Sequence, residues 1–437
     1  MSLSRSESLS ALRSRLLSPT AVGAAAGLLD QVLVSLANLA VGLLVLRYGT
    51  KAEFGLYGLA YTAIVVATSF SSSLFGMPMT VSYYKVAAEE RAAYAGALFE
   101  GQAVLSLLLC GVVFALALAG GEVALGGSPE QQAWALALLC CPLAMAQGLV
   151  RTHRFLVQQG LVALGLSALH AAAWAGLTGL FIMQGAAAHL AALGGYGLAC
   201  GVVALLGLIR SGLVAVGPAR VVQAVRSVWE QGRWAMGGVA VGSLQNSAHL
   251  YLLAWLTSVE AVAEVNAGRM LISPIGMVLI GMNRGMLPMM AKLFAEGRQG
   301  ALRRLAAGAL LFLLLLTVVY LAALFVSWDL LLALVLRGKY EHVGALVLAW
   351  AAVVTVQAVN LILSAQVQVE GDFRSLTLLS LYTAIPMLIV AVPAIWWGGG
   401  MGGLLALVAG QAALTALLVR LLRRGGKRPD MPGPASA

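Results

Sequence analysis

Apolar runs of about twenty residues recur along the whole chain, and they restrict its fold more than any other feature of the sequence. An α-helix rises about 1.5 Å per residue, so each run is long enough to cross a bilayer core of about 30 Å. Charged residues make up only 10% of the 437 residues, whereas a soluble domain carries roughly a quarter. The sequence therefore predicts an all-α integral membrane protein.

Hydropathy predicts about twelve transmembrane helices in two pseudo-symmetric six-helix bundles around a central cavity. The expected spans cover residues 21–46, 54–83, 95–119, 133–150, 161–183, 190–209, 235–256, 262–288, 306–328, 345–368, 376–397 and 402–422. The first six form an N-terminal bundle at 21–209, and the last six form a C-terminal bundle at 235–422. Between them we expect a cytoplasmic connector at 210–234. A cytoplasmic amphipathic leader at 1–20 and a disordered cytoplasmic tail at 423–437 complete the chain.

Lysine and arginine are distributed unequally between alternate loops. With a cytoplasmic N-terminus, the inner loops hold 22 of the 27 basic residues and the outer loops hold 4. Because cytoplasmic loops retain positive charge, this split predicts that both termini are cytoplasmic. It also explains the formal charge of +10 without nucleic-acid binding, since the basic residues are scattered over short loops. A signal peptide is an alternative for the leader, but the full span that follows it suits a retained helix better.

The two halves of the chain resemble sequence repeats. Asn38 in the first span matches Asn246 in the seventh at an offset of 208, and Gln147 in the fourth matches Gln357 in the tenth at an offset of 210. Six spans per half give both halves the same topology. The predicted symmetry is therefore a twofold axis along the membrane normal, with the cavity between the bundles.

Amide and other polar side chains form lines at helical spacing on three of the spans. The candidate site residues among them are Gln31 and Asn38 on the first span, Gln245, Asn246 and His249 on the seventh, and Gln357 and Asn360 on the tenth. Their spacing predicts polar faces around a shared hydrophilic cavity. Close helix packing is the alternative, because small and polar residues also favour helix contact. His249 alone is more typical of a hydrogen-bonded packing residue than of a ligand.

Two charged residues lie inside spans, namely Asp30 in the first and Arg269 in the eighth. Insertion scales put the cost of such a charge at about 2.5–3.5 kcal/mol, so each needs a partner, a watery cavity or a role. Both are candidate site residues, and a buried Asp30–Arg269 ion pair is the alternative. Arg151, Arg154 and Arg284 are expected around the inner mouth, where positive-inside placement also explains them.

Signatures of catalysis and of metal binding are missing. The sequence contains no HExxH, no GxSxG and no Walker-type GxxxxGK[ST]. The four cysteines fall inside apolar segments, so neither a disulfide framework nor a zinc site is indicated. A membrane-embedded transferase would normally show acidic pairs near a loop, and none stands out. We therefore expect a protein that is not an enzyme and that uses no cofactor or metal.

Motifs in the first and eighth spans carry a resemblance to a known family. Arg47-Tyr48 is followed, after a short loop, by Phe54-Gly55-Leu56-Tyr57, and residues 262–274 read VAEVNAGRMLISP. Both segments resemble polysaccharide-biosynthesis flippases of the Wzx type, in the multidrug/oligosaccharidyl-lipid/polysaccharide exporter (MOP) superfamily. Thr50-Lys51 stands where that family usually has Gly-Pro in the loop.

The resemblance implies a transporter of the bacterial cytoplasmic membrane. Such flippases move lipid-linked oligosaccharides, carried on polyprenyl pyrophosphate, from the inner to the outer leaflet by alternating access. It implies that the amides bond the sugar and that Arg269 meets the pyrophosphate. The depth of Asp30 in the first span predicts that Asp30 takes part in coupling, since a carboxylate at mid-membrane could take up a proton during the cycle. The resemblance also implies membrane lipid as surroundings, and a glycan polymerase or glycosyltransferase as possible partners.

Two other functions stay open. A cation-coupled multidrug antiporter of the same superfamily would use Asp30 to bind the coupling ion, and it would be expected to have an aromatic, acidic cavity. The candidate residues here are mostly amide and basic. A non-catalytic membrane subunit of a glycan-assembly complex is the third possibility, and such a protein, when purified, would move nothing.

Overall fold

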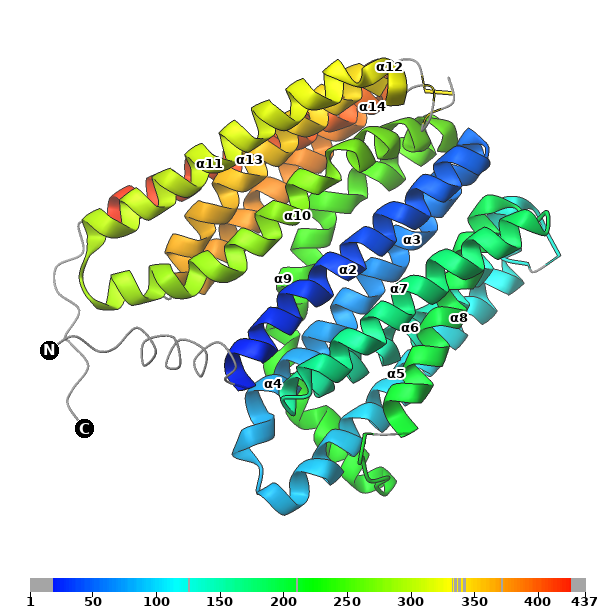
Figure 1. Cartoon of the computed structure of the whole chain (residues 1–437), viewed down its shortest axis with the longest axis vertical. Helices are drawn as coiled ribbons and strands as arrows, with labels where there is room; N and C mark the ends of the chain where they lie inside the picture. The colour runs from blue at the N-terminus through cyan, green and yellow to red at the C-terminus, as the bar shows by residue number, and fades with distance from the viewer. Residues whose placement is uncertain are drawn as a thin grey trace, which may run out of the picture. The chain divides into compact units, whose positions relative to one another are not determined.

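The computed structural model describes residues 19–124, 126–209, 211–331, 333, 336, 339–340, 343–370 and 372–425. Every regular element in these ranges is helical, which confirms the predicted all-α fold class (Figure 1). Most of the expected leader and tail lies outside the described residues. The chain divides into two compact units, Met1–Ala240 and Val241–Ala437.

Unit 1 contains the first six expected spans. Its helices are α2 (Pro19–Tyr48), α3 (Lys51–Ser71), the π-helix η1 (Ser72–Gly76), α4 (Met77–Ser82), the short 3₁₀ helices η2 (Tyr83–Lys85) and η3 (Ala88–Glu90), α5 (Arg91–Ala119), α6 (Pro129–Leu156), α7 (Gly160–Met183) and α8 (Ala188–Ile209). Helix α9 (Pro218–Leu256) begins in unit 1 and ends in unit 2, because the division falls between Ala240 and Val241. The expected connector is thus continuous with the seventh span.

Unit 2 contains the remaining spans. Its other helices are α10 (Val259–Ala295), α11 (Gln299–Val326), α12 (Trp328–Leu331), α13 (Val343–Val369) and α14 (Phe373–Gly425). Ten described segments are long and apolar enough to cross a membrane, so the protein is a multi-pass membrane protein. One of the ten, residues 374–423, holds two expected spans. Helix α9 is absent from the ten because Gln245, Asn246 and His249 lower its hydropathy.

Proline and glycine explain the two irregular spans. The backbone nitrogen of Pro78 carries no hydrogen, so it cannot donate the backbone hydrogen bond of an α-helix. The π-helical turn η1 lies just before Pro78. Gly399 breaks α14 with φ 53° and ψ −135°, a conformation that favours glycine. The two arms of α14 on either side of Gly399 are the expected spans at 376–397 and 402–422.

Helix caps and helix lengths repeat between the units. Thr50 caps α3 by accepting from the Glu53 N–H, and Ser258, 208 residues later, caps α10 by accepting from the Ala261 N–H. Helices α5 and α11 begin 208 residues apart. After the extra helix α12 the offset grows to 213, measured between the ends of α6 and α13. An offset of 213 leads from Gln147 to Asn360, whereas the repeat predicted from the sequence matches Gln147 with Gln357 at 210.

Two helices expose long apolar faces. Their exposed side chains are Val104, Leu107, Leu108, Val112, Val113 and Leu116 on α5, and Leu311, Phe312, Leu315, Val318 and Val319 on α11. Contiguous apolar faces of this length are unfavourable in water but match hydrocarbon chains. These corresponding helices of the two units therefore face lipid.

The predicted orientation can be tested with single cysteines in a variant that lacks the four native ones. A cysteine at Gln184, exposed between α7 and α8, should react with an impermeant thiol reagent added to intact cells. A cysteine at Gln223, exposed near the start of α9, should react only after permeabilisation, because its segment is expected inside. The reverse pattern would overturn the orientation.

Candidate functional site: an amide cavity in the second unit

An open cavity of about 460 Å³ lies in unit 2 between α9, α10, α13 and α14. Four of the predicted site residues line it, namely Gln245, Asn246, Gln357 and Asn360. Its other lining residues are Leu279, Ile280, Leu361, Ser364, Ser380, Gln411 and Leu414. The lining residues carry amides and hydroxyls but no formal charge. No cluster of three or more His, Cys, Asp or Glu able to hold a metal ion occurs among the described residues. We call this space the amide cavity.

Gln245 joins α9 to the first arm of α14. Its Nε2 donates to the backbone oxygen of Ser380 at 2.8 Å and to Thr383 Oγ1 at 3.0 Å. Gln245 and Thr383 are both buried, and a buried polar group without a partner costs about 1–3 kcal/mol, so these bonds hold the two helices in register. Both bonds use the amide nitrogen, which leaves Oε1 of Gln245 to accept a bond from the cavity.

Asn360 joins α13 to the second arm of α14. Its Nδ2 donates to the backbone oxygen of Gln411 at 2.9 Å and to Gln411 Oε1 at 2.7 Å. Thr415 Oγ1 donates in turn to Asn360 Oδ1 at 2.7 Å. Both ends of the Asn360 amide are hydrogen-bonded within the protein and the side chain is buried. Asn360 therefore lines the cavity mainly as a structural residue.

Gln357 and Asn246 form the accessible part of the amide cavity. Gln357 Nε2 donates to Asn246 Oδ1 at 3.0 Å, and Asn246 Nδ2 donates to the backbone oxygen of Gly242 at 2.8 Å. Asn246 is exposed and Gln357 is half-buried. An exposed pair of amides can exchange its mutual bond for bonds to a hydroxylated ligand at little cost, since each amide both donates and accepts.

Sequence analysis missed the contribution of α14 to this site. Ser380 and Thr383 meet Gln245, while Gln411 and Thr415 meet Asn360. Gln411 and Thr415 stand four residues apart on one face of the twelfth span, a spacing that was visible in the sequence. Nothing in the sequence paired them with Asn360, because that pairing depends on how α14 bends at Gly399.

Arg269 and His249 lie outside the lining of the amide cavity. Both contact Trp350 of α13: the Arg269 guanidinium carbon is 6.0 Å from the Trp350 ring centroid, and the His249 ring centroid is 6.1 Å away. Trp350 is itself fixed by a bond from its Nε1 to the backbone oxygen of Val265 at 2.8 Å. His249 is only 2% exposed, whereas Arg269 is exposed. His249 is therefore buried beside Trp350, with neither ring nitrogen hydrogen-bonded to any described residue, and Arg269 lies at the surface of unit 2.

Asp30 is buried in unit 1 with partners of its own. The Ser167 hydroxyl donates to Asp30 Oδ1, and Arg151 Nε lies 3.6 Å from Asp30 Oδ2. Asp30 is 3% exposed, so its charge is matched within the same unit by α6 and α7. Arg151, predicted at the inner mouth, is the partner of this carboxylate, and its side chain is 31% exposed. The alternative ion pair with Arg269 is not needed to explain how Asp30 is accommodated.

The remaining predicted residues have different environments. Arg154 is buried, not open to the inner mouth, and its guanidinium donates to Gln159 Oε1 at 2.5 Å and to the backbone oxygen of Gly207 at 2.7 Å. These bonds tie the end of α6 to α7 and α8. The side chain of Arg284 lies outside the described part of the structure. In α2, Gln31 Nε2 donates to Ser35 at 3.4 Å, and Asn38 is exposed.

An aromatic cluster in unit 1 was also missed. It comprises Tyr57, Tyr61, His170, Trp174 and Tyr196, whose neighbouring ring centroids are 4.8–5.8 Å apart. These distances are typical of favourable stacked and edge-on aromatic pairs. The cluster joins α3, α7 and α8. Its members are far apart in the sequence, and single aromatic residues in apolar spans gave no signal.

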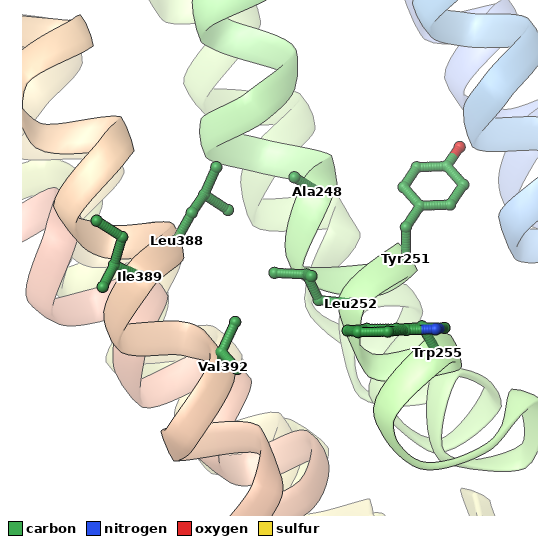
Figure 2. A pocket seen from close by; sticks show the side chains of 7 residues that line it. All are labelled: Ala248, Tyr251, Leu252, Trp255, Leu388, Ile389 and Val392. Atoms are coloured by element: carbon green, nitrogen blue, oxygen red, sulfur yellow. The ribbon is translucent and has the colours of Figure 1, made fainter.

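An apolar groove of about 500 Å³ lies between α9 and α14 (Figure 2). It is lined by Ala248, Tyr251, Leu252 and Trp255 of α9 and by Leu388, Ile389 and Val392 of α14. Trp255 is 78% exposed at one end. The groove and the amide cavity are both lined by residues of α9 and α14.

No protein-family model and no curated protein sequence matches the chain. Solved structures are similar to it over nearly its whole length. The lipid II flippase MurJ in an inward closed conformation has a TM-score of 0.72 and 11% identity, covering 92% of this chain and 87% of MurJ. An inward-facing multidrug-resistance MATE family transporter of the MOP superfamily has a TM-score of 0.68 and 13% identity, covering 91% and 96%.

A MOP superfamily transporter from Pyrococcus furiosus, described as having a binding pocket of reverse polarity that suggests a different function, has a TM-score of 0.63. Its identity is 14%, and the similarity covers 93% of this chain and 96% of that one. The chain therefore has the fold of MOP superfamily transporters. At these identities the likeness shows the fold alone.

The contacts of Asp30 predict a structural role for its pair with Arg151. Asp30→Asn should lower the midpoint of thermal unfolding by several degrees, because Arg151 would lose its carboxylate partner. Asp30→Asn combined with Arg151→Gln should recover most of the loss, since neither charge is then left unmatched. Tryptophan fluorescence of the purified proteins would measure the midpoints, with Glu122→Gln, in an exposed loop, as a control. Wild-type stability of Asp30→Asn would instead favour a role in coupling.

Proposed function

We propose that the protein moves a lipid-linked oligosaccharide, carried on polyprenyl pyrophosphate, from the inner to the outer leaflet of the bacterial cytoplasmic membrane. Transport would proceed by alternating access, without covalent chemistry. One observation carries the proposal: helices α9 and α14 line both an uncharged amide cavity and a groove of hydrocarbon side chains. An amphiphile with a polar, hydroxylated head and a long hydrocarbon tail fits such a pair of sites.

The chemistry of the amide cavity suits sugars. A sugar hydroxyl both donates and accepts hydrogen bonds, as do the exposed amides of Gln357 and Asn246. Oε1 of Gln245 adds an acceptor deeper in the wall. Neutral amides can bind hydroxyls without the desolvation cost of buried charges, which suits a ligand that must later be released.

The apolar groove suits a polyprenyl tail. Tail transfer from lipid to protein gains little free energy, because acyl chains are as apolar as the groove. The groove would therefore contribute through its shape, by holding the polyprenyl tail next to the bound sugar head, and not through a gain in binding free energy. Its walls are mainly branched or aromatic side chains with few rotamers, including Leu252, Ile389 and Trp255.

Arg269 is the residue proposed to meet the pyrophosphate. Arg269 is an exposed residue whose guanidinium lies over the Trp350 ring, which limits the orientations that the guanidinium can take. A guanidinium grips phosphate oxygens with two parallel bonds and keeps its charge when partly dehydrated. Lysine at this position would keep the charge but lose the planar fork.

A cation-coupled multidrug antiporter is the second candidate, because a MATE transporter shares the fold and Asp30 is a buried carboxylate. The contact of Asp30 with Arg151 argues against the antiporter, because a carboxylate already paired with an arginine attracts a coupling cation only weakly. A non-catalytic subunit that works with a glycan polymerase or glycosyltransferase is the third. Glycan transfer by the purified protein alone would eliminate this third candidate.

Reconstituted vesicles provide the test, with transfer of a polyprenyl-pyrophosphate oligosaccharide measured alongside exchange of a cationic dye. Gln357→Leu should reduce glycan transfer about fivefold to tenfold, the effect of losing a hydrogen bond worth about 1 kcal/mol. Gln368→Leu, on the same helix but outside the cavity lining, should transfer normally. Arg269→Ala should lose nearly all transfer, and Arg269→Lys should retain part of it.

Dye exchange without glycan transfer would establish the antiporter instead. Equal transfer by the wild type and Gln357→Leu would remove the amide cavity from the substrate path. Full activity of Arg269→Ala would remove Arg269 from the site.

A further inference from the structure

The first turns of α9 expose two apolar side chains beside two arginines. Val222 and Trp229 are 67% and 50% exposed, and Arg226 and Arg233 are exposed as well. Their spacing of i, i+4, i+7 and i+11 places all four side chains on one face of the helix. We call this face the connector stripe.

The opposite face of the helix is docked on unit 1. Ala224 and Val228 are buried in a cluster with Leu74 and Phe75 of the second span and Leu98 of α5. These residues form one apolar cluster, which fixes the face of the helix that is docked. The helix is thereby held with one face inward, so the connector stripe remains outward.

The docked helix packs on α5 close to where the exposed aliphatic face of α5 begins. Just before the docked helix, the Val216 N–H donates to Glu100 Oε1 at 2.9 Å. The exposed aliphatic face of α5 begins one turn later, at Val104. Phe99 of α5 also packs edge-on against His153, with centroids 5.9 Å apart, close to the end of α6. Polar contacts thus give way to lipid-facing ones at this level, as at a membrane surface.

We infer that the connector stripe binds the anionic lipid headgroups of the cytoplasmic leaflet. Arg226 and Arg233 bind the phosphates, while Val222 and Trp229 enter the layer between headgroups and acyl chains. Tryptophan prefers this layer, and arginine extends its apolar stem along it with the charge at the headgroups. Each basic residue near an anionic leaflet strengthens binding about fivefold, so the pair contributes about thirtyfold.

The pattern of the stripe distinguishes a lipid surface from a protein partner. A protein interface has a continuous apolar core from which charge is largely excluded. Here each apolar side chain is followed by an arginine, so no continuous apolar core forms. Alternating apolar and basic groups on one helix face match a bilayer surface. There the basic side chains can reach the phosphates while the apolar side chains lie next to the acyl chains.

Quenching of Trp229 by brominated lipids tests this inference, with the full-length protein in phosphatidylcholine vesicles. A minority of the lipid carries bromine on its acyl chains, as either phosphatidylglycerol or phosphatidylcholine. The signal of Trp229 is the difference between the wild type and Trp229→Phe. Brominated phosphatidylglycerol should quench Trp229 several-fold more than brominated phosphatidylcholine. Arg226→Gln/Arg233→Gln should abolish this preference, and Arg226→Lys/Arg233→Lys should retain most of it.

Arg303→Gln/Arg304→Gln is the matched control, since it removes two exposed arginines at the start of α11 and leaves the stripe intact. The preference for phosphatidylglycerol should survive in this variant. Its loss there would show that net charge alone matters, and would overturn the inference. Equal quenching by both lipids would refute headgroup recognition. No quenching by either lipid would show that the stripe faces water or another protein.

Discussion

The hydrocarbon core of a bilayer offers no water to polar groups, and the rest of this structure depends on that constraint. Backbone groups are satisfied inside helices, so every regular element of the described chain is helical. Polar side chains must likewise find partners within the protein. Asp30 finds Ser167 and Arg151, Arg154 finds a backbone oxygen of α8, and Asn360 finds Gln411. Each of these contacts also joins two helices. The hydrogen bonds that satisfy the polar groups therefore also fix how the helices pack.

The two units meet this constraint in different ways. They share a cap at Thr50 and Ser258 and a lipid-facing helix at corresponding positions. Unit 1 encloses Asp30 with Arg151 and packs an aromatic cluster among α3, α7 and α8. Unit 2 lines its open cavity with neutral amides, among them Gln357 and Asn246. The repeat therefore supplies a common frame, and the divergence of its polar residues makes unit 2 the better candidate for binding a neutral, hydroxylated head.

Sequence reasoning predicted what depends on local pattern. Apolar run length gave the helices, and amide spacing gave four members of the amide cavity. It could not give contacts that depend on tertiary packing. Asp30 and Arg151 are far apart in the sequence, and their pairing requires α2 and α6 to approach at matching depths. Arg269 was recognised as unusual, but its position over Trp350 depends on how α10 packs on α13.

The central claim is that an amphiphile binds with its head in the amide cavity. Photocrosslinking of a polyprenyl-pyrophosphate disaccharide with a diazirine on the sugar tests it most directly, with the purified protein in vesicles. We expect labelled peptides from α9 and α13 around Asn246 and Gln357, and competition by the unlabelled glycolipid. Polyprenyl phosphate without sugar should compete more weakly. Labelling confined to other helices, or equal competition by the sugar-free lipid, would contradict the account.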